Sequence, residues 1–433
     1  YTQAYTLSLH DALPISLQIA NSNDFELGLG AKVKLFDFAP GAVSGNFGSA
    51  SSAFSRSVAF NLATGSVIGL GSYSPSGFEA AAAHTPNEAA MLRQVRVNTA
   101  GGVNQYYGGR LLEFVSSALA SGNAANVTAA FDKASPEAYA GLSEHVKMSM
   151  LDNLAELGGY EVTSEPVHMM TGSFNYTQAK SQREDGYARY KTVDNRMNIG
   201  ALAQWSFGRV QASYARSNGH VESSYMRGNA DGNQFSVGAS VPFALDGAVR
   251  LAARYAYGDY SFKGTRVTNA GTASFGTVDG TSSIFGGGFE YMKTSNKLSV
   301  DVTAEVLSVL NKIDGFAETG AGALENLSVS SQRDRFTMAM GNIQLGYQFQ
   351  SNFQGFMTVK VDHDFDSTLH AVTARVSLED VNMTVENPGI TDTRVKLGLG
   401  SRVNLGRNII WSVEGNVGNA SSYGAKTGIS FRF

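Results

Sequence analysis

The side chains best suited to chemistry in this sequence are Asp362, His363 and Asp364, in the stretch VDHDFD. Imidazole and carboxylate groups are common metal ligands, so such a cluster could bind a divalent cation. The stretch, however, has the two-residue period of a β-strand, in which neighbouring side chains point to opposite faces. This geometry disfavours one compact metal site, and we expect neither a metal nor another cofactor.

No catalytic motif accompanies this stretch. The seven histidines are scattered, and no HExxH, GxSxG or nucleotide-binding glycine pattern occurs in a suitable context. Cysteine is absent, which excludes thiol nucleophiles and zinc–thiolate sites. The net charge is −4 without a block of like charges, which indicates no nucleic-acid partner. We therefore expect that the chain is not an enzyme.

Charged residues recur instead on one face of a series of alternating segments that begins after Pro166. In RVKLGLGSRVNL, for example, Val395, Leu397 and Leu399 alternate with polar residues. This period is typical of strands with one apolar and one polar face. It recurs in residues 167–180, 194–207, 209–217, 233–244, 248–263, 281–293, 297–310, 334–350, 353–366, 391–405, 408–418 and 423–433. The pattern predicts twelve antiparallel strands.

Tight turns such as FGR and LGRN alternate along the chain with long polar loops. The long loops are centred on residues 181–193, 218–232, 264–280, 311–333 and 367–390. Short turns at one end and long loops at the other are typical of an outer-membrane barrel. A soluble sandwich would also alternate, and charge alone does not separate the two folds. Aromatic residues near the tight turns favour the barrel: Trp205, Phe207, Phe243, Phe349, Phe353, Trp411, Phe431 and Phe433. Tyr255, Tyr257 and Tyr260 suggest a second aromatic ring near the loops.

In a closed barrel of this kind the polar face lines the lumen. The charged residues expected there are Arg250, Arg254, Glu290, Asp301, Glu305, Lys360, Asp362, Arg394, Lys396, Arg402, Glu414 and Arg432. Twelve strands enclose a lumen wide enough for one helix of about 10–12 Å diameter.

A helix is predicted directly before the first strand, over residues 136–157. Ser135 can cap it, Pro136 suits its first turn, and apolar residues follow at three- and four-residue spacing from Tyr139 onward. Its charged residues are Glu137, Glu144, Lys147, Asp152 and Glu156, for which we expect contacts of mixed sign with the lumen. The alternative is that the helix packs outside the barrel.

Upstream of this helix the pattern changes twice. Residues 1–16 contain TLSLHDALPIS, which resembles a translated sequencing adapter, so we treat them as an artefact. Residues 17–84 show short β-like segments, as in the last part of a larger β structure. Residues 85–165 form a helical linker, which begins with a capping box between Thr85 and Glu88.

Several of these segments together resemble the C-terminal translocator of type V autotransporters of Gram-negative bacteria. They are TPNEAA, the helical ALASGNAANVTAAFDKASPEAYAGL, the strand VKLGLGSRVNLG and the terminal GISFRF, and the resemblance covers residues 85–433. It implies an all-β fold: a 12-stranded antiparallel transmembrane β-barrel over residues 166–433, with the helix in its lumen and a β/helical passenger remnant before it. It also implies that Phe433, Phe431 and Ile429 form a signal for the outer-membrane barrel assembly machinery. Some family members cleave their passenger at an asparagine of the pore helix, but Asn153 lacks their double-asparagine pattern, and we interpret it as an ordinary helical residue.

The resemblance implies an outer-membrane protein that anchors and exports its own N-terminal passenger to the cell surface. The expected partners are outer-membrane lipid, the assembly machinery and the passenger segment, and the barrel is expected to be monomeric. Two alternatives stay open: a passive outer-membrane pore, and the anchor of a surface enzyme whose catalytic passenger is missing.

Overall fold

The computed structural model describes the barrel region in residues 166–181, 187, 189–322, 325–365, 370–376, 382–387 and 391–433. Before the barrel it describes residues 83, 85–97, 105–106, 115, 118 and 123–156, together with five short strands between residues 16 and 69. The chain forms two compact units, and most of the second, Ser135–Ser377 with Thr384–Phe433, is the barrel. The adapter-like residues 1–15 lie outside the described part.

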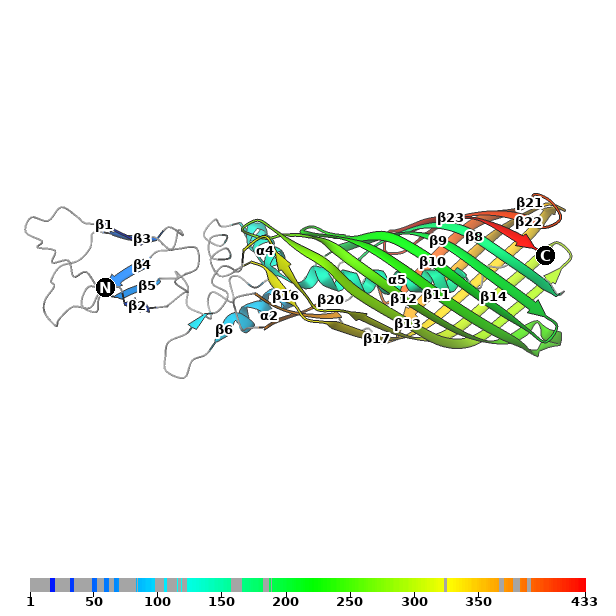
Figure 1. Cartoon of the computed structure of the whole chain (residues 1–433), viewed down its shortest axis with the longest axis horizontal. Coiled ribbons are helices and arrows are strands. Elements are labelled where there is room, and N and C mark those ends of the chain that lie inside the picture. Colours follow the sequence, from blue (N-terminus) through cyan, green and yellow to red (C-terminus); the bar gives the residue numbers. More distant parts are fainter. Residues whose placement is uncertain are drawn as a thin grey trace, which may run out of the picture. The chain divides into compact units, whose positions relative to one another are not determined.

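The second unit is a closed antiparallel barrel of twelve strands (Figure 1), which confirms the predicted fold. Each strand pairs with its neighbour in sequence order, and the last strand pairs with the first. The strands are β8 (Val167–Lys180), β9 (Tyr190–Trp205), β10 (Gly208–Ser223), β11 (Met226–Ala244), β12 (Val249–Val267), β13 (Thr272–Ser295), β14 (Leu298–Ile313), β17 (Gln332–Gln350), β18 (Phe353–Asp364), β21 (Thr393–Asn404), β22 (Ile409–Gly418) and β23 (Ser422–Arg432).

Strand β23 closes the barrel by pairing with β8 from Tyr423 opposite Gln178 to Arg432 opposite Met169. The chain end is part of this seam, because the backbone N–H of Phe433 donates to the carbonyl of His168 at 3.1 Å. Closure gives each edge strand a partner, as the hydrocarbon core of a bilayer requires.

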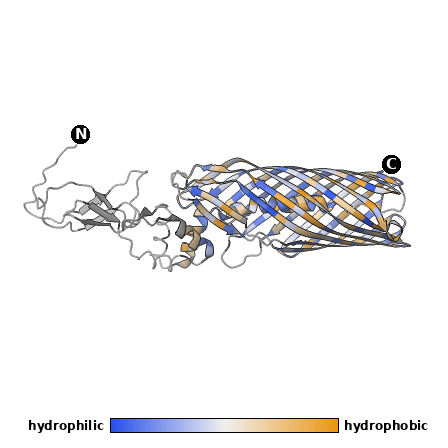
Figure 2. Ribbon diagram, turned by 90° about the horizontal axis from the view of Figure 1, so that it is seen from below, coloured by the Kyte–Doolittle hydropathy of each residue, from blue (hydrophilic) through white to orange (hydrophobic). Residues whose placement is uncertain are grey.

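On the twelve barrel strands the large apolar side chains are exposed on the outer face. Figure 2 shows hydrophobic and hydrophilic residues interleaved along the ribbons of the barrel. Leu397 and Leu399 are 53% and 71% exposed, whereas Arg394 and Lys396, at alternate positions just before them on β21, are buried. On the described strands, five or six successive outward positions carry mostly apolar side chains, a length that suits the hydrocarbon core of a bilayer. We call this zone the apolar belt; among its members are Met197, Ile199, Phe235, Val241, Phe285, Phe289, Val306, Leu310, Ile343, Leu345, Leu397, Leu399 and Val417.

Aromatic side chains border the belt. All eight residues predicted near the tight turns are exposed there, among them Phe207, Phe243 and Phe433. At the loop side, Tyr255 and Tyr257 point outward as expected, but the expectation for Tyr260 is wrong. Tyr260 is buried in the lumen, where its ring lies 6.4 Å from that of His145. The reason is its odd spacing from Tyr257, which places it on the opposite face of β12.

The helix α5 (Ala140–Glu156), preceded by the 3-10 turn η1 (Glu137–Tyr139), lies inside the barrel (Figure 1). It contacts β9 to β14 and β17, so packing outside the barrel is excluded. Of the helices that the structure describes, none combines the length and apolar character needed to cross a membrane.

Two of the predicted long loops are largely strand. Strands β10 and β11 stay paired up to Glu222 opposite Arg227, and β12 and β13 up to Val267 opposite Thr272, so residues 218–232 and 264–280 mostly extend the barrel wall. In these extensions the outward positions are polar, as at Asn229 and Asp231, whereas the inward positions carry small or apolar residues such as Val221 and Phe275. The polarity of the two faces is thus the reverse of that in the apolar belt, so the lipid-facing pattern does not continue into them. The next two loops contain strands of their own: β15 (Phe316–Thr319), β16 (Leu327–Val329), β19 (His370–Val376) and β20 (Asn382–Asn387).

The first unit contains short strands and helices. Its strands form a parallel pair, β1 (Ser16–Ile19) with β3 (Ser49–Ser52), a three-stranded sheet of β2 (Lys32–Lys34), β5 (Ser66–Gly69) and β4 (Val58–Asn61), and the pair β6 (Arg96–Val97) and β7 (Gln105–Tyr106). Helix α2 (Pro86–Val95) begins at the predicted capping box, with Glu88 N–H on the Thr85 hydroxyl at 3.1 Å and Thr85 N–H on the Glu88 carboxylate at 2.9 Å. Helix α4 (Ala124–Ala134) follows.

Candidate functional site

The site is the lumen of the barrel together with the helix that occupies it. Ser135 caps the start of the helical segment, because its hydroxyl accepts the Glu137 N–H at 3.1 Å. The predicted apolar residues Leu142, Val146 and Met150 are fully buried. Polar residues on the other sides of α5 are buried as well. The wall surrounds α5 and supplies polar partners to its polar residues.

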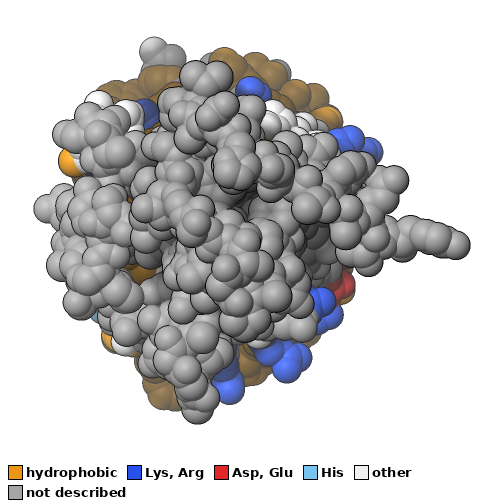
Figure 3. Space-filling model, turned by 90° about the vertical axis from the view of Figure 1, so that its left-hand side faces the viewer, with side chains coloured by type: hydrophobic (Ala, Val, Ile, Leu, Met, Phe, Trp, Pro, Cys, Tyr) orange, Lys and Arg blue, Asp and Glu red, His pale blue; other side chains and the backbone are white. Residues whose placement is uncertain are grey.

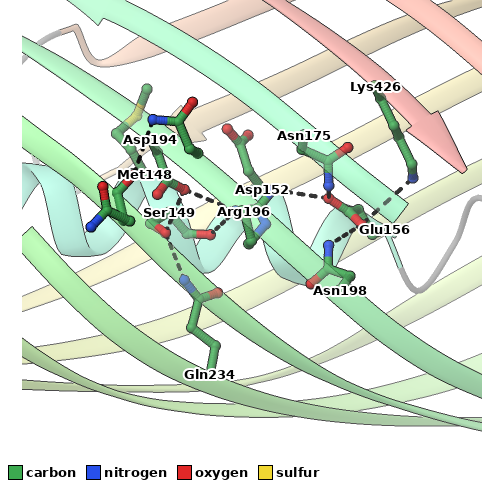
Figure 4. Close-up of polar contacts among 12 residues, drawn as sticks. Met148, Ser149, Asp152, Glu156, Asn175, Asp194, Arg196, Asn198, Gln234 and Lys426 are labelled. Atoms are coloured by element: carbon green, nitrogen blue, oxygen red, sulfur yellow. Dashed lines mark hydrogen bonds and ion pairs between the residues drawn. The ribbon is translucent and has the colours of Figure 1, made fainter. Parts of the chain in front are cut away.

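Glu156, at the C-terminal end of α5, binds three strands at once (Figure 4). Arg196 of β9 approaches its carboxylate at 2.9 Å and Lys426 of β23 at 3.6 Å. The side-chain amides of Asn175 on β8 and Asn198 on β9 donate to the same carboxylate. Glu156 therefore joins the helix end to the seam at which β8 and β23 close the barrel.

Two turns earlier, Ser149 is held from the same side (Figure 4). Its hydroxyl donates to Asp194 at 2.8 Å and accepts from Gln234 at 2.6 Å, while its carbonyl accepts from Arg196 at 2.7 Å. Arg196 also lies 3.3 Å from Asp194. The guanidinium is 2% exposed, so it bridges two turns of α5 away from bulk water.

Asp152 faces the opposite wall. Its carboxylate lies 3.0 Å from the Lys396 ammonium and 3.4 Å from the Arg394 guanidinium, both on β21. Arg394 also pairs with Asp362 of β18. Buried charges are costly unless they are paired, and here each finds a partner of opposite sign.

Toward the loop end, Lys147 continues the same pattern. Its ammonium lies 2.7 Å from Glu144 on the helix, 3.7 Å from Asp364 and 4.5 Å above the Phe336 ring. Asn311 of β14 donates to the Ser143 carbonyl at 3.0 Å. Polar contacts thus anchor α5 along its whole length.

A compact cluster surrounds the start of the helix beyond the apolar belt. Tyr139 lies edge-on to Phe275 and Phe316, with ring centroids 5.4 and 5.0 Å apart. Its hydroxyl donates to Glu318 of β15, which also binds Arg266 at 2.7 Å. Burial and the neighbouring carboxylate raise the pKa of Tyr139 well above its usual value. The phenol therefore stays a hydrogen-bond donor.

A second buried charge cluster lies beside the last turns of α5. Arg254 donates to the Leu154 carbonyl at 3.2 Å and pairs with Glu290 at 3.1 Å and Glu305 at 2.8 Å. Arg209 binds Glu290 at 2.7 Å. The cation on a carbonyl of the last turn complements the negative end of the helix dipole.

The structure places every charged residue expected in the lumen on the inward face. Eight are buried: Arg250, Arg254, Glu290, Asp301, Glu305, Asp362, Arg394 and Lys396. Four near the turn end are half-buried: Lys360, Arg402, Glu414 and Arg432. Of the helix residues, Glu144, Lys147, Asp152 and Glu156 form the pairs given above, and Glu137 is buried at the start.

Sequence reasoning missed several partners. Asp194, Arg196, Arg209 and Lys426 follow the same alternation as the predicted lumen residues, so that signal could have found them. Glu318 lies on a short strand within a long loop, where no periodic pattern identifies it.

Two glycines let the helix approach the wall closely. A Cβ on Gly258 of β12 would lie 2.6 Å from the Met150 sulfur, and one on Gly141 would lie 2.8 Å from the nearer Val221 methyl. Both distances are shorter than van der Waals contact. The helix and the barrel are therefore fitted to each other.

Within the described residues there is no group of three or more metal-ligating side chains. Asp362 and Asp364 point inward, whereas His363 is on the outward face and contacts Thr393 at 2.8 Å. Asn153 is fully buried, and its amide has no hydrogen-bond partner among the described residues. The arrangement holds the helix in place.

The three C-terminal residues expected to guide assembly lie on the outer face of β23 or directly after it. Ile429, Phe431 and Phe433 are 42%, 49% and 74% exposed. The Phe433 ring stacks on His168 of β8 at 6.3 Å, so the last residue covers the outside of the seam.

The sequence model of the Autotransporter beta-domain matches residues 170–416. No curated protein matched the chain. Among solved structures, the translocator domain of the autotransporter NalP from Neisseria meningitidis is similar, with a TM-score of 0.53 and 16% identity over 68% of this chain and 98% of that one. The transport unit of AIDA-I from Escherichia coli has a TM-score of 0.41 and 12% identity over 68% and 99% of the two chains. The beta domain of the Bordetella autotransporter BrkA has a TM-score of 0.40 and 16% identity over 62% and 100%.

The match to the family model covers more than half of the 433 residues, and the NalP domain has the same fold. The chain therefore belongs to the autotransporter beta-domain family, and its barrel is an outer-membrane translocator rather than a catalytic domain.

Proposed function

We propose that the barrel exports the segment that precedes its helix to the cell surface and then anchors it there. The observation that carries this proposal is the direction of α5. The helical segment starts at Tyr139 among residues of the loop end, and its last residue, Glu156, contacts the middle of β8 at Ser173, closer to the turn end. The polypeptide before Ser135 therefore leaves the lumen at the loop end.

The two ends of the barrel differ in the way that outer-membrane barrels do. Short turns such as residues 206–207 lie at one end, and the other end carries the strand extensions and β15, β16, β19 and β20. In this class of protein the short turns face the periplasm and the longer loops face outside. With this orientation, residues 17–84 belong to a passenger at the cell surface and residues 85–165 connect it to the barrel.

We also propose that Ile429, Phe431 and Phe433 are read by the barrel assembly machinery from the periplasmic side, and that the barrel works as a monomer. The three side chains lie at the turn end beside the β8–β23 seam. The assembly machinery would form this pairing last, because it joins the final strand to the first. Within the described strands the twelve-stranded wall is already closed, so no second copy is needed to complete it.

A passive pore is the competing function, and the filled lumen argues against it. Charged and polar contacts hold α5 at four levels, through Ser143, Ser149, Asp152 and Glu156. An anchor for a surface enzyme is compatible with the same barrel, because any catalytic group would belong to the passenger.

Planar-bilayer conductance separates a plugged translocator from a pore. The intact chain is expected to conduct little, and a variant without residues 137–165 is expected to open. Deletion of residues 17–84, which leaves α5 in place, is the matched control and should stay closed. Large conductance of the intact chain would contradict the proposal.

A further inference from the structure

The outer surface of the barrel has a groove of about 600 Å³ over β12, β13, β14 and β17. It lies at the edge of the apolar belt that is nearer the loops. In the antiparallel register, Ser283 is opposite Leu310 and Phe285 is opposite Ser308. Each small side chain thus lies beside a large apolar one, which leaves a hollow with apolar walls.

Two arginines line the upper part of this groove. Arg333 and Arg335 of β17 are exposed and point outward, with Arg335 opposite Leu310 and Arg333 opposite Lys312. Asp334 between them points inward, toward Ser143. The groove therefore combines apolar walls at the membrane level with a pair of guanidinium groups directly above.

The positive charge of the two arginines is not compensated within the described part of the barrel. Neither guanidinium has a hydrogen bond or an ion pair there, and the nearby Lys312 pairs with Asp314 at 2.5 Å. Seen from the loop end, Lys and Arg side chains lie at the periphery in front of hydrophobic ones (Figure 3).

The outward face of β10–β12 provides a contrast. Arg216 and Lys263 also lie above the apolar belt, but the outward carboxylates Asp231 and Asp259 lie on the strands between and beside them. Basic residues there are interleaved with acidic ones, whereas the groove carries an excess of positive charge.

An arginine at the edge of the hydrocarbon core is stabilised by an anionic headgroup, and its planar guanidinium suits phosphate oxygens. We propose that the groove binds a phosphorylated glycolipid of the outer leaflet, with a phosphate on Arg333 and Arg335 and an acyl chain against Phe285 and Leu310. The assignment to the outer leaflet rests on the proposed orientation of the barrel, with its loops at the cell surface.

The test uses the full chain in detergent, with binding of lipid A measured by native mass spectrometry. The variant R333Q/R335Q should bind about 25-fold more weakly, since each basic side chain at an anionic membrane surface contributes roughly fivefold. The variant R333K/R335K should keep most of the affinity. The matched control R216Q/K263Q should bind like the parent chain.

Two further ligands identify the chemistry. Dephosphorylated lipid A should bind the parent chain as weakly as lipid A binds R333Q/R335Q, and phosphatidylglycerol should bind less tightly than lipid A. Unchanged binding by R333Q/R335Q, equal loss in R216Q/K263Q, or equal affinity for phosphatidylglycerol would overturn the proposal. These results do not depend on conductance, so they are distinguishable from a failure of the translocator function.

Discussion

Replacing Glu156 with Gln should loosen the helix from the barrel wall. The change removes the negative charge that faces Arg196 at 2.9 Å and Lys426 at 3.6 Å but keeps the size of the side chain. Loss of one partner from a buried pair costs about 3–5 kcal/mol when the other charge is left alone. Arg196 retains Asp194 and the Ser149 carbonyl, so we expect a smaller loss of unfolding free energy, about 2 kcal/mol.

The assay is urea unfolding of the full chain in detergent, followed by tryptophan fluorescence and by circular dichroism. A double-mutant cycle with Arg196→Gln isolates the pair. The two single changes each leave a charge unpaired, whereas E156Q/R196Q removes both. The double variant should therefore lose less stability than the sum of the single losses, by about 1–2 kcal/mol.

Glu414→Gln is the matched control. Glu414 also lies on the inward face, but it accepts a hydrogen bond from the Thr358 hydroxyl at 2.9 Å and has no ion pair among the described residues. A carboxamide oxygen can still accept that hydrogen bond, so the change should cost less than about 0.5 kcal/mol. Equal stability of E156Q and E414Q would refute the idea that the ion pairs of Glu156 hold the helix.

Three other changes test separate parts of the account. Leu399→Lys, near the middle of the apolar belt, should lower the unfolding free energy in lipid vesicles by about 2–4 kcal/mol. Leu405→Lys, at the turn-side edge of the belt, should lower it by less than about 1 kcal/mol. Equal losses would contradict the claim that the apolar belt faces the lipid. Tyr139→Phe removes the donor to Glu318 and should cost about 1.5 kcal/mol. Because the native pKa of Tyr139 is raised, this difference from the parent should persist from below pH 7 to about pH 10 and shrink only above that, as unfolding curves at several pH values would show. Deletion of Phe433 should lower the amount of folded barrel in outer-membrane fractions. The control Phe207→Ser, on the same rim, should leave that amount unchanged. Wild-type levels of folded barrel after the deletion would argue against a role of Phe433 in assembly.

The barrel could be predicted from sequence because its signal is local and repeated. The alternation of Val395, Leu397 and Leu399 with Arg394 and Lys396 can be read without knowing which face of the strand points inward. The bilayer then decides the orientation, because the apolar face must contact lipid. The terminal strand that pairs Tyr423 with Gln178 follows from the need to close the sheet.

Other features depend on tertiary contacts that no local pattern records. The strand extensions around Glu222 and Arg227 are polar on the outer face and bury Val221 and Met226 inside, the reverse of the lipid-facing pattern, so backbone pairing identifies them as barrel wall. The wall covers α5 on all sides, and polar residues such as Ser143 are buried only because the lumen supplies Asn311 as a partner. Which charge meets which depends on the rotation of the helix in the barrel, as the pairing of Asp152 with Lys396 shows.

The most direct test of surface export is labelling of an epitope tag placed within residues 17–84 of the full chain in a Gram-negative host. If the barrel translocates the segment before its helix, an impermeant antibody should bind the tag on intact cells, and added protease should remove it while leaving the barrel folded in the membrane. A tag that becomes accessible only after the outer membrane is permeabilised would contradict the account.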